Sequence, residues 1–137
     1  MKQFLDIESK QALTNYRLQR AKETLLEADV LIQGEFYNAV VNRLYYACYY
    51  VVIALLLKND ISAQTHQGVK QMFSLHFIVT KKIENTYSRF YSQLFNDRIS
   101  GDYDDFLHYD YEKISVIRPQ AEEFIKRISI EIDKYDT

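Results

Sequence analysis

The longest uncharged stretch of the chain is LYYACYYVVIALLL, at residues 44–57. A bilayer span takes about 20 apolar residues, so this shorter stretch is expected to be a buried core element and not a membrane segment. Its two valines and one isoleucine would also suit a strand, but the sequence from Glu35 to about Leu57 contains no turn signal, which favours a helix. Because this helix is apolar nearly all round, it is predicted to be the central one.

A second long helix is predicted before it, from about Asp6 to Gly34. Steps of three and four separate the apolar residues Leu18, Ala21, Leu25, Ala28 and Ile32. This spacing places them on one helical face, and Gly34 is a suitable C-cap. Two long helices joined at Gly34 should form an antiparallel hairpin.

The rest of the chain also predicts helices. After a polar connection at 58–64, Thr65 is a candidate N-cap for a shorter third helix. A fourth helix is marked by the apolar stripe Ile83, Tyr87, Phe90, Tyr91, Leu94 and Phe95. A last helix spans about 114–132, where Pro119 either kinks it or opens a second segment.

Composition supports the same fold class. Three glycines and one proline in 137 residues are too few for a turn-rich sandwich or barrel. We therefore expect a single all-α domain over residues 1–137, an up-and-down bundle of four to five helices.

Charge and cysteine content limit the functional classes. Seventeen basic and 19 acidic residues give a net charge of −2, which excludes a general basic nucleic-acid surface but leaves a local patch open. The single cysteine, Cys48, excludes an internal disulfide framework and fits a reducing compartment. Since the N-terminal MKQFLDIESK is too charged for a signal peptide, a cytoplasmic location is expected.

Arg98 is the first candidate functional residue. The stripe of the fourth helix continues to it, which predicts a position at the buried side of that helix near its C-terminus. Such a guanidinium needs a partner. Arg98 either forms an ion pair with Asp102 that closes the helix, or projects into a cleft to bind a phosphate, with the Tyr103 hydroxyl beside it.

Polar residues on the central helix are the second candidate. Arg43 lies next to Asn42 in an otherwise apolar helix, so it faces either a carboxylate of a neighbouring helix or a polar cleft. Four tyrosines follow, which suit either nucleotide stacking or a core and interface role: Tyr45, Tyr46, Tyr49 and Tyr50.

Histidines give two further candidates. His66, at the start of the third helix, suits either an anion site or a simple surface position. Asp104, Asp105 and His108 would permit metal ligation on a helix, but one such cluster is weak, and no metal or cofactor is expected. Cys48 is expected to serve packing, because no local basic group would lower its pKa.

Three motifs, in order, resemble the small stand-alone bacterial and archaeal branch of the HEPN family (higher eukaryotes and prokaryotes nucleotide-binding domain). They lie between about Ala28 and Ile128. They are Arg43 followed by Tyr45 and Tyr46, then Thr65, His66 and Gly68, and finally Arg98, Asp102 and Tyr103.

The resemblance implies a helical bundle that dimerises, usually with a composite cleft at the two-fold axis. Many HEPN proteins are metal-independent ribonucleases that act as toxins, often encoded beside a minimal nucleotidyltransferase antitoxin; others bind nucleotides without catalysis. Catalytic members carry an arginine followed after four to six residues by a histidine. Here Tyr103 stands at that place, and a phenol with a pKa near 10 is a poor general base.

Three functional hypotheses follow. The first is a dimeric module that binds nucleotide, RNA or a partner through Arg43, Asn42, His66, Arg98 and Asp102, paired with a nucleotidyltransferase antitoxin. The second is a metal-independent ribonuclease in which Arg98 and Tyr103 are catalytic, or in which His66 replaces the missing histidine. The third is a purely structural bundle. Binding to DNA or a membrane is not expected.

Overall fold

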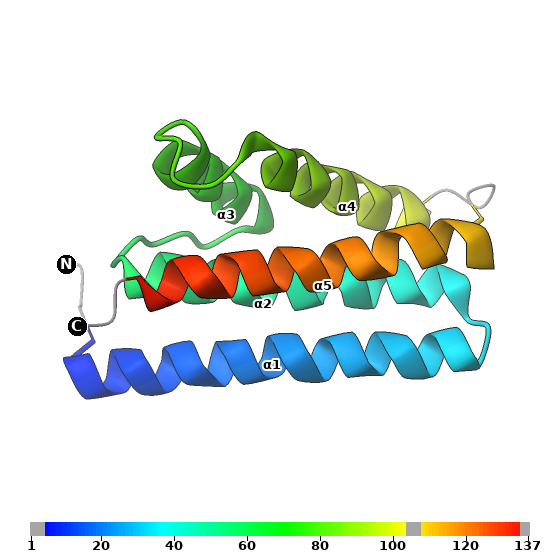
Figure 1. The fold of residues 1–137 in the computed structure, drawn as a ribbon, viewed down its shortest axis with the longest axis horizontal. Helices are drawn as coiled ribbons and strands as arrows, with labels where there is room; N and C mark the ends of the chain where they lie inside the picture. Colours follow the sequence, from blue (N-terminus) through cyan, green and yellow to red (C-terminus); the bar gives the residue numbers. More distant parts are fainter. Residues whose placement is uncertain (1–4, 104–107, 135–137) are drawn as a thin grey trace.

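The computed structural model describes residues 5–103 and 108–134, with the backbone only for residues 100–103. The regular structure of these residues is helical, which confirms the predicted all-α bundle (Figure 1). The elements are α1 (Ile7–Gln33), α2 (Tyr37–Lys58), α3 (His66–Phe73), the π-helical turn η1 (Ser74–Ile78), α4 (Asn85–Tyr103) and α5 (Tyr111–Asp133).

The predicted central position of α2 is confirmed. It packs against α1, α3, α4 and α5 (Figure 1). Helices α1 and α2 form the predicted antiparallel hairpin, and α5 lies alongside α2, while α3 and α4 cover the other side. Helix α2 is long and apolar enough to cross a membrane, because an 18-residue segment within it has a mean hydropathy of 1.6. However, 61% of that segment is buried inside the protein, as expected for a core helix.

Local sequence explains both ends of α1. The N-cap is Asp6, whose Oδ1 accepts the Ser9 backbone N–H at 2.7 Å. Gly34 is the C-cap as predicted, but it is right-handed (φ −83°), and the left-handed residue is Glu35 (φ 64°). A Cβ at position 34 would lie 2.8 Å from the exposed Phe36 ring, so a larger residue here would require that ring to shift.

The start of α3 is built by its Thr-His-Gln-Gly sequence. The Thr65 Oγ1 accepts the Gly68 backbone N–H at 2.9 Å, which confirms the predicted N-cap. A Cβ on Gly68 would lie only 3.0 Å from that Oγ1, so glycine leaves room for the cap. The motif thereby fixes His66 as the first residue of α3.

Helix α4 differs from the expectation at both ends. Ile83 is buried (2% exposed) but precedes the helix, which begins at Asn85. At its other end the helix continues to Tyr103, beyond the stripe that ends at Arg98. The predicted burial of Arg98 is only partly right, because its side chain is partly exposed.

Pro119 lies inside one continuous helix, α5, so it does not open a second segment. Asp110 caps its start by accepting the Lys113 backbone N–H at 2.9 Å. Arg118 binds both carboxylate oxygens of Asp29 (2.7 and 2.9 Å), which connects α5 to α1. This bidentate geometry is the strong form of such an ion pair.

Candidate functional site around Tyr45

Tyr45 joins two of the predicted site residues. Its ring, on α2, is fully buried. The Arg98 guanidinium carbon, from α4, lies 4.9 Å from the centre of that ring, and the His66 ring, from α3, has its centre 5.7 Å away. Arg98 and His66, which are 32 positions apart in sequence, are therefore neighbours on one tyrosine.

The Tyr45 hydroxyl makes a hydrogen bond with Nδ1 of His66 at 2.9 Å. Burial raises the pKa of Tyr45 to about 12, although the Tyr91 hydroxyl and Arg98 act in the opposite direction. The phenol is therefore neutral at physiological pH, with a proton to donate.

His66 has an environment that favours its neutral form. Its ring packs 4.6 Å from that of Tyr49 and 5.7 Å from that of Tyr46, measured between ring centres. Burial lowers the pKa of His66, and the nearby positive charge of Arg98 lowers it further. The side chain is still partly exposed, so it can reach a ligand.

The lowered pKa of His66 predicts a pH effect on stability. Below the ordinary value of 6.5, the unfolded chain takes up a proton before the folded one, so stability falls as pH falls through the folded pKa. We expect the melting temperature of the wild type to drop more steeply between about pH 7 and 5 than that of His66→Gln. Equal slopes in a thermal melting series would contradict this assignment.

Arg43 and Asn42 lie beside this pair. The Arg43 guanidinium lies 5.3 Å from the centre of the Tyr46 ring, and Arg98 lies 5.9 Å from the same centre. The Oδ1 atom of Asn42 accepts a hydrogen bond from the Arg43 guanidinium at 2.8 Å. The carboxylate of Glu27, on α1, lies 3.6 Å from the same guanidinium. The structure therefore shows the carboxylate neighbour that one of the two alternatives for Arg43 predicts, and the side chain is partly exposed.

Lys70 adds a cation that sequence reasoning missed. Its Nζ lies 4.8 Å from the centre of the Phe95 ring, and Arg98 approaches the same ring at 5.9 Å. Lys70 is four residues after His66 on α3, a spacing that places both on one helical face. That spacing was the available signal.

The remaining predicted residues are not brought to this site by the described structure. The side chains of Asp102 and Tyr103, and all of Asp104 and Asp105, lie outside the described residues. His108 is exposed. Among the residues that the structure describes, no three histidine, cysteine or acidic side chains are grouped to hold a metal ion.

Cys48 is fully buried, and burial raises its pKa. Both observations agree with the packing role expected for it, because the thiolate is the reactive form of cysteine.

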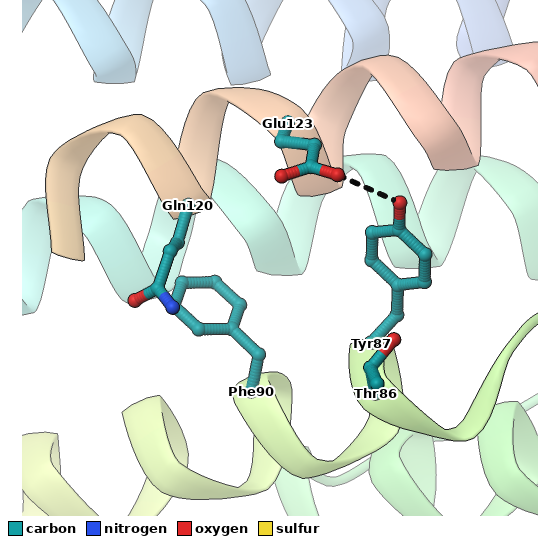
Figure 2. Close-up of a pocket in the computed structure, with 5 residues that line it drawn as sticks. All are labelled: Thr86, Tyr87, Phe90, Gln120 and Glu123. Atoms are coloured by element: carbon teal, nitrogen blue, oxygen red, sulfur yellow. Dashed lines mark hydrogen bonds between the residues drawn. The ribbon is translucent and has the colours of Figure 1, made fainter. Parts of the chain in front are cut away.

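Two surface pockets lie away from Tyr45. One, of about 270 Å³, lies between α4 and α5, where the hydroxyl of Tyr87 donates to Glu123 at 3.1 Å, both residues lining the pocket (Figure 2). The other, of about 390 Å³, lies at the α1–α2 turn. Neither includes Arg98 or His66 among its lining residues.

Comparison with known proteins identifies the family. The sequence model of the family described as "HEPN domain" matches residues 14–131 of this chain. The chain belongs to the HEPN family. This confirms the resemblance seen in the sequence motifs, and the match extends beyond the Ala28–Ile128 region that carried them.

Similar HEPN proteins occur in bacteria and archaea. A UPF0332 protein of Thermotoga maritima is 34% identical over 119 residues, which cover 87% of this chain and 90% of its own length. A protein of Methanocaldococcus jannaschii named "Putative toxin MJ0605" is 35% identical over 108 residues, covering 79% of this chain and 80% of its own length. A second protein of that archaeon, "Putative toxin MJ0142", is 29% identical over 110 residues, which cover 80% of this chain and 75% of its own length.

Proposed function

We propose that this chain is a toxin-like HEPN protein that binds the phosphate of an RNA strand or nucleotide at Arg98 and His66. One observation carries the proposal: both side chains pack on the buried ring of Tyr45 and remain partly exposed. A guanidinium and an imidazole that pack on one ring are a suitable pair of donors for phosphate oxygens.

The surrounding charges support an anion at this place. Lys70 and Arg43 lie around the same aromatic cluster, so three cationic side chains approach it from α2, α3 and α4. His66 is also the first residue of α3, where the helix dipole favours negative charge. The net charge of −2 therefore does not argue against local phosphate binding.

Binding is favoured over cleavage. A ribonuclease needs a general base or acid near the phosphate, and His66 already uses one of its two ring nitrogens for Tyr45. The Arg-x4–6-His pattern of catalytic HEPN members has Tyr103 at its histidine position. The toxin names of the archaeal relatives support an action on a cellular target.

The protein is proposed to act as a homodimer. Three tyrosines of α2 are only partly buried within one chain: Tyr46, Tyr49 and Tyr50. A second copy would cover such rings. A minimal nucleotidyltransferase is the proposed antitoxin partner, on the pattern of other HEPN pairs.

Calorimetric titration with the 5′-phosphorylated dinucleotide pUpU tests the function. We expect saturable binding that weakens as salt rises, because phosphate contacts release counterions. The RNA should remain intact in the presence of EDTA, and light scattering should give twice the chain mass of 16.3 kDa. No binding at millimolar pUpU would refute the function, and cleavage in EDTA would favour the ribonuclease alternative.

A further inference from the structure

We propose that Tyr45 is a positioning residue that sets the tautomer of His66. In this arrangement the Tyr45 hydroxyl donates to Nδ1 of His66, 2.9 Å away, so the ring proton stays on Nε2. That Nε2–H is then a donor for the phosphate that Arg98 binds, an inference that rests on the proposed function.

The hydroxyl of Tyr45 is fixed in place by its surroundings. The ring stacks on Tyr91 with 5.8 Å between centres and on Tyr49 with 6.0 Å, and Phe95 meets it edge-on at 6.0 Å. Tyr45 is fully buried and Tyr91 is 1% exposed. Because buried, close-packed side chains keep one rotamer, the hydroxyl stays at the Nδ1 atom.

The direction of the hydrogen bond follows from the charge states. The groups that face His66 are the tyrosines of α2 (Tyr45, Tyr46 and Tyr49) and the Arg98 cation of α4. A nearby cation and burial both disfavour imidazolium, so His66 is neutral and has one nitrogen that accepts. Since an unprotonated imidazole nitrogen is a better acceptor than a phenol oxygen, the phenol donates.

This tautomer has a consequence for chemistry. With the proton on Nε2, the free side of His66 donates a hydrogen bond and has no lone pair to remove a proton from a ribose hydroxyl. Arg98 and His66 then act as two donors toward one oxyanion. Tyr45 therefore favours phosphate binding by His66 and opposes its use as a general base.

Nitrogen NMR of the wild type tests the tautomer directly. The Nδ1 and Nε2 shifts of His66 distinguish the two tautomers, and this measurement needs neither ligand nor variant. We expect Nδ1 to be unprotonated and Nε2 to carry the proton at pH 7.5. A protonated Nδ1 in the free wild type would overturn the proposal.

Tyr45→Phe keeps the ring and removes only the hydroxyl. We expect a mixture of His66 tautomers and about five- to tenfold weaker pUpU binding, the effect of one lost hydrogen bond. Tyr49→Phe is the matched control, because its ring also contacts His66 while the Nδ1 bond belongs to Tyr45. Thermal melting verifies that both variants are folded.

Two outcomes separate this inference from the proposed function. If Tyr45→Phe leaves the tautomer unchanged, or if Tyr49→Phe has the same effect on it, the positioning role is wrong even where pUpU binds. If the wild type binds no pUpU but shows the expected tautomer, which shifts only in Tyr45→Phe, the role of Tyr45 stands and the function fails.

Discussion

Replacing Arg98 with alanine is expected to weaken pUpU binding by about 10- to 150-fold. A hydrogen bond to a charged group contributes about 1.5–3 kcal/mol, which converts to that range. Arg98 approaches the Tyr45, Tyr46 and Phe95 rings, so its guanidinium is held in a defined position before the ligand arrives. Calorimetric titration of wild type and variant at one fixed salt concentration measures the ratio.

Two further variants make the Arg98 result specific. Arg89→Ala removes an exposed arginine from the same helix, so it gives the same change in net charge, and we expect binding to stay within about twofold of wild type. Arg98→Lys keeps the charge but loses the planar fork, and should bind with intermediate affinity. A folded Arg98→Ala that binds as well as wild type but melts earlier would support the purely structural alternative.

Replacing Phe124 with alanine is expected to lower the free energy of unfolding by about 3–5 kcal/mol. Phe124 is fully buried on α5 and joins the aromatic core under the site. It stacks on Tyr91 with 5.6 Å between ring centres and 9° between planes, and it meets Phe73 at 6.0 Å. Its loss opens a cavity between α3, α4 and α5 that a rigid bundle fills only in part.

The matched control for this core substitution is Ile130→Ala on the same helix. Ile130 is 57% exposed, so its truncation should change the free energy of unfolding by about 0.5 kcal/mol or less. Urea denaturation followed by circular dichroism measures both variants. A Phe124→Ala loss below about 1 kcal/mol would show that α5 is not held by this aromatic cluster.

The fold was predictable because its signals are local. The caps Asp6 and Thr65 each satisfy a backbone N–H within three residues, so the sequence around them specifies the helix start. The uncharged stretch from Leu44 to Leu57 favours contact with several other helices, which makes α2 central. Handedness at the α1–α2 turn was not predicted, because Glu35 and not Gly34 is the left-handed residue there.

The candidate site was predictable only in parts. Arg98, His66 and Arg43 were each identified from their own motif, but their meeting depends on how α3 and α4 pack on α2. Tyr45 was one of four tyrosines with a choice between stacking and core roles. It is a core residue by burial, and its hydroxyl at 2.9 Å from His66 adds a role that helical periodicity cannot reveal.

A crystal structure of the protein with pUpU tests the central claim most directly. The prediction is a phosphate within hydrogen-bond distance of both the Arg98 guanidinium and His66 Nε2, with Tyr45 still bonded to Nδ1. A phosphate bound elsewhere, with Arg98 and His66 both turned away from it, would contradict the assignment of this site.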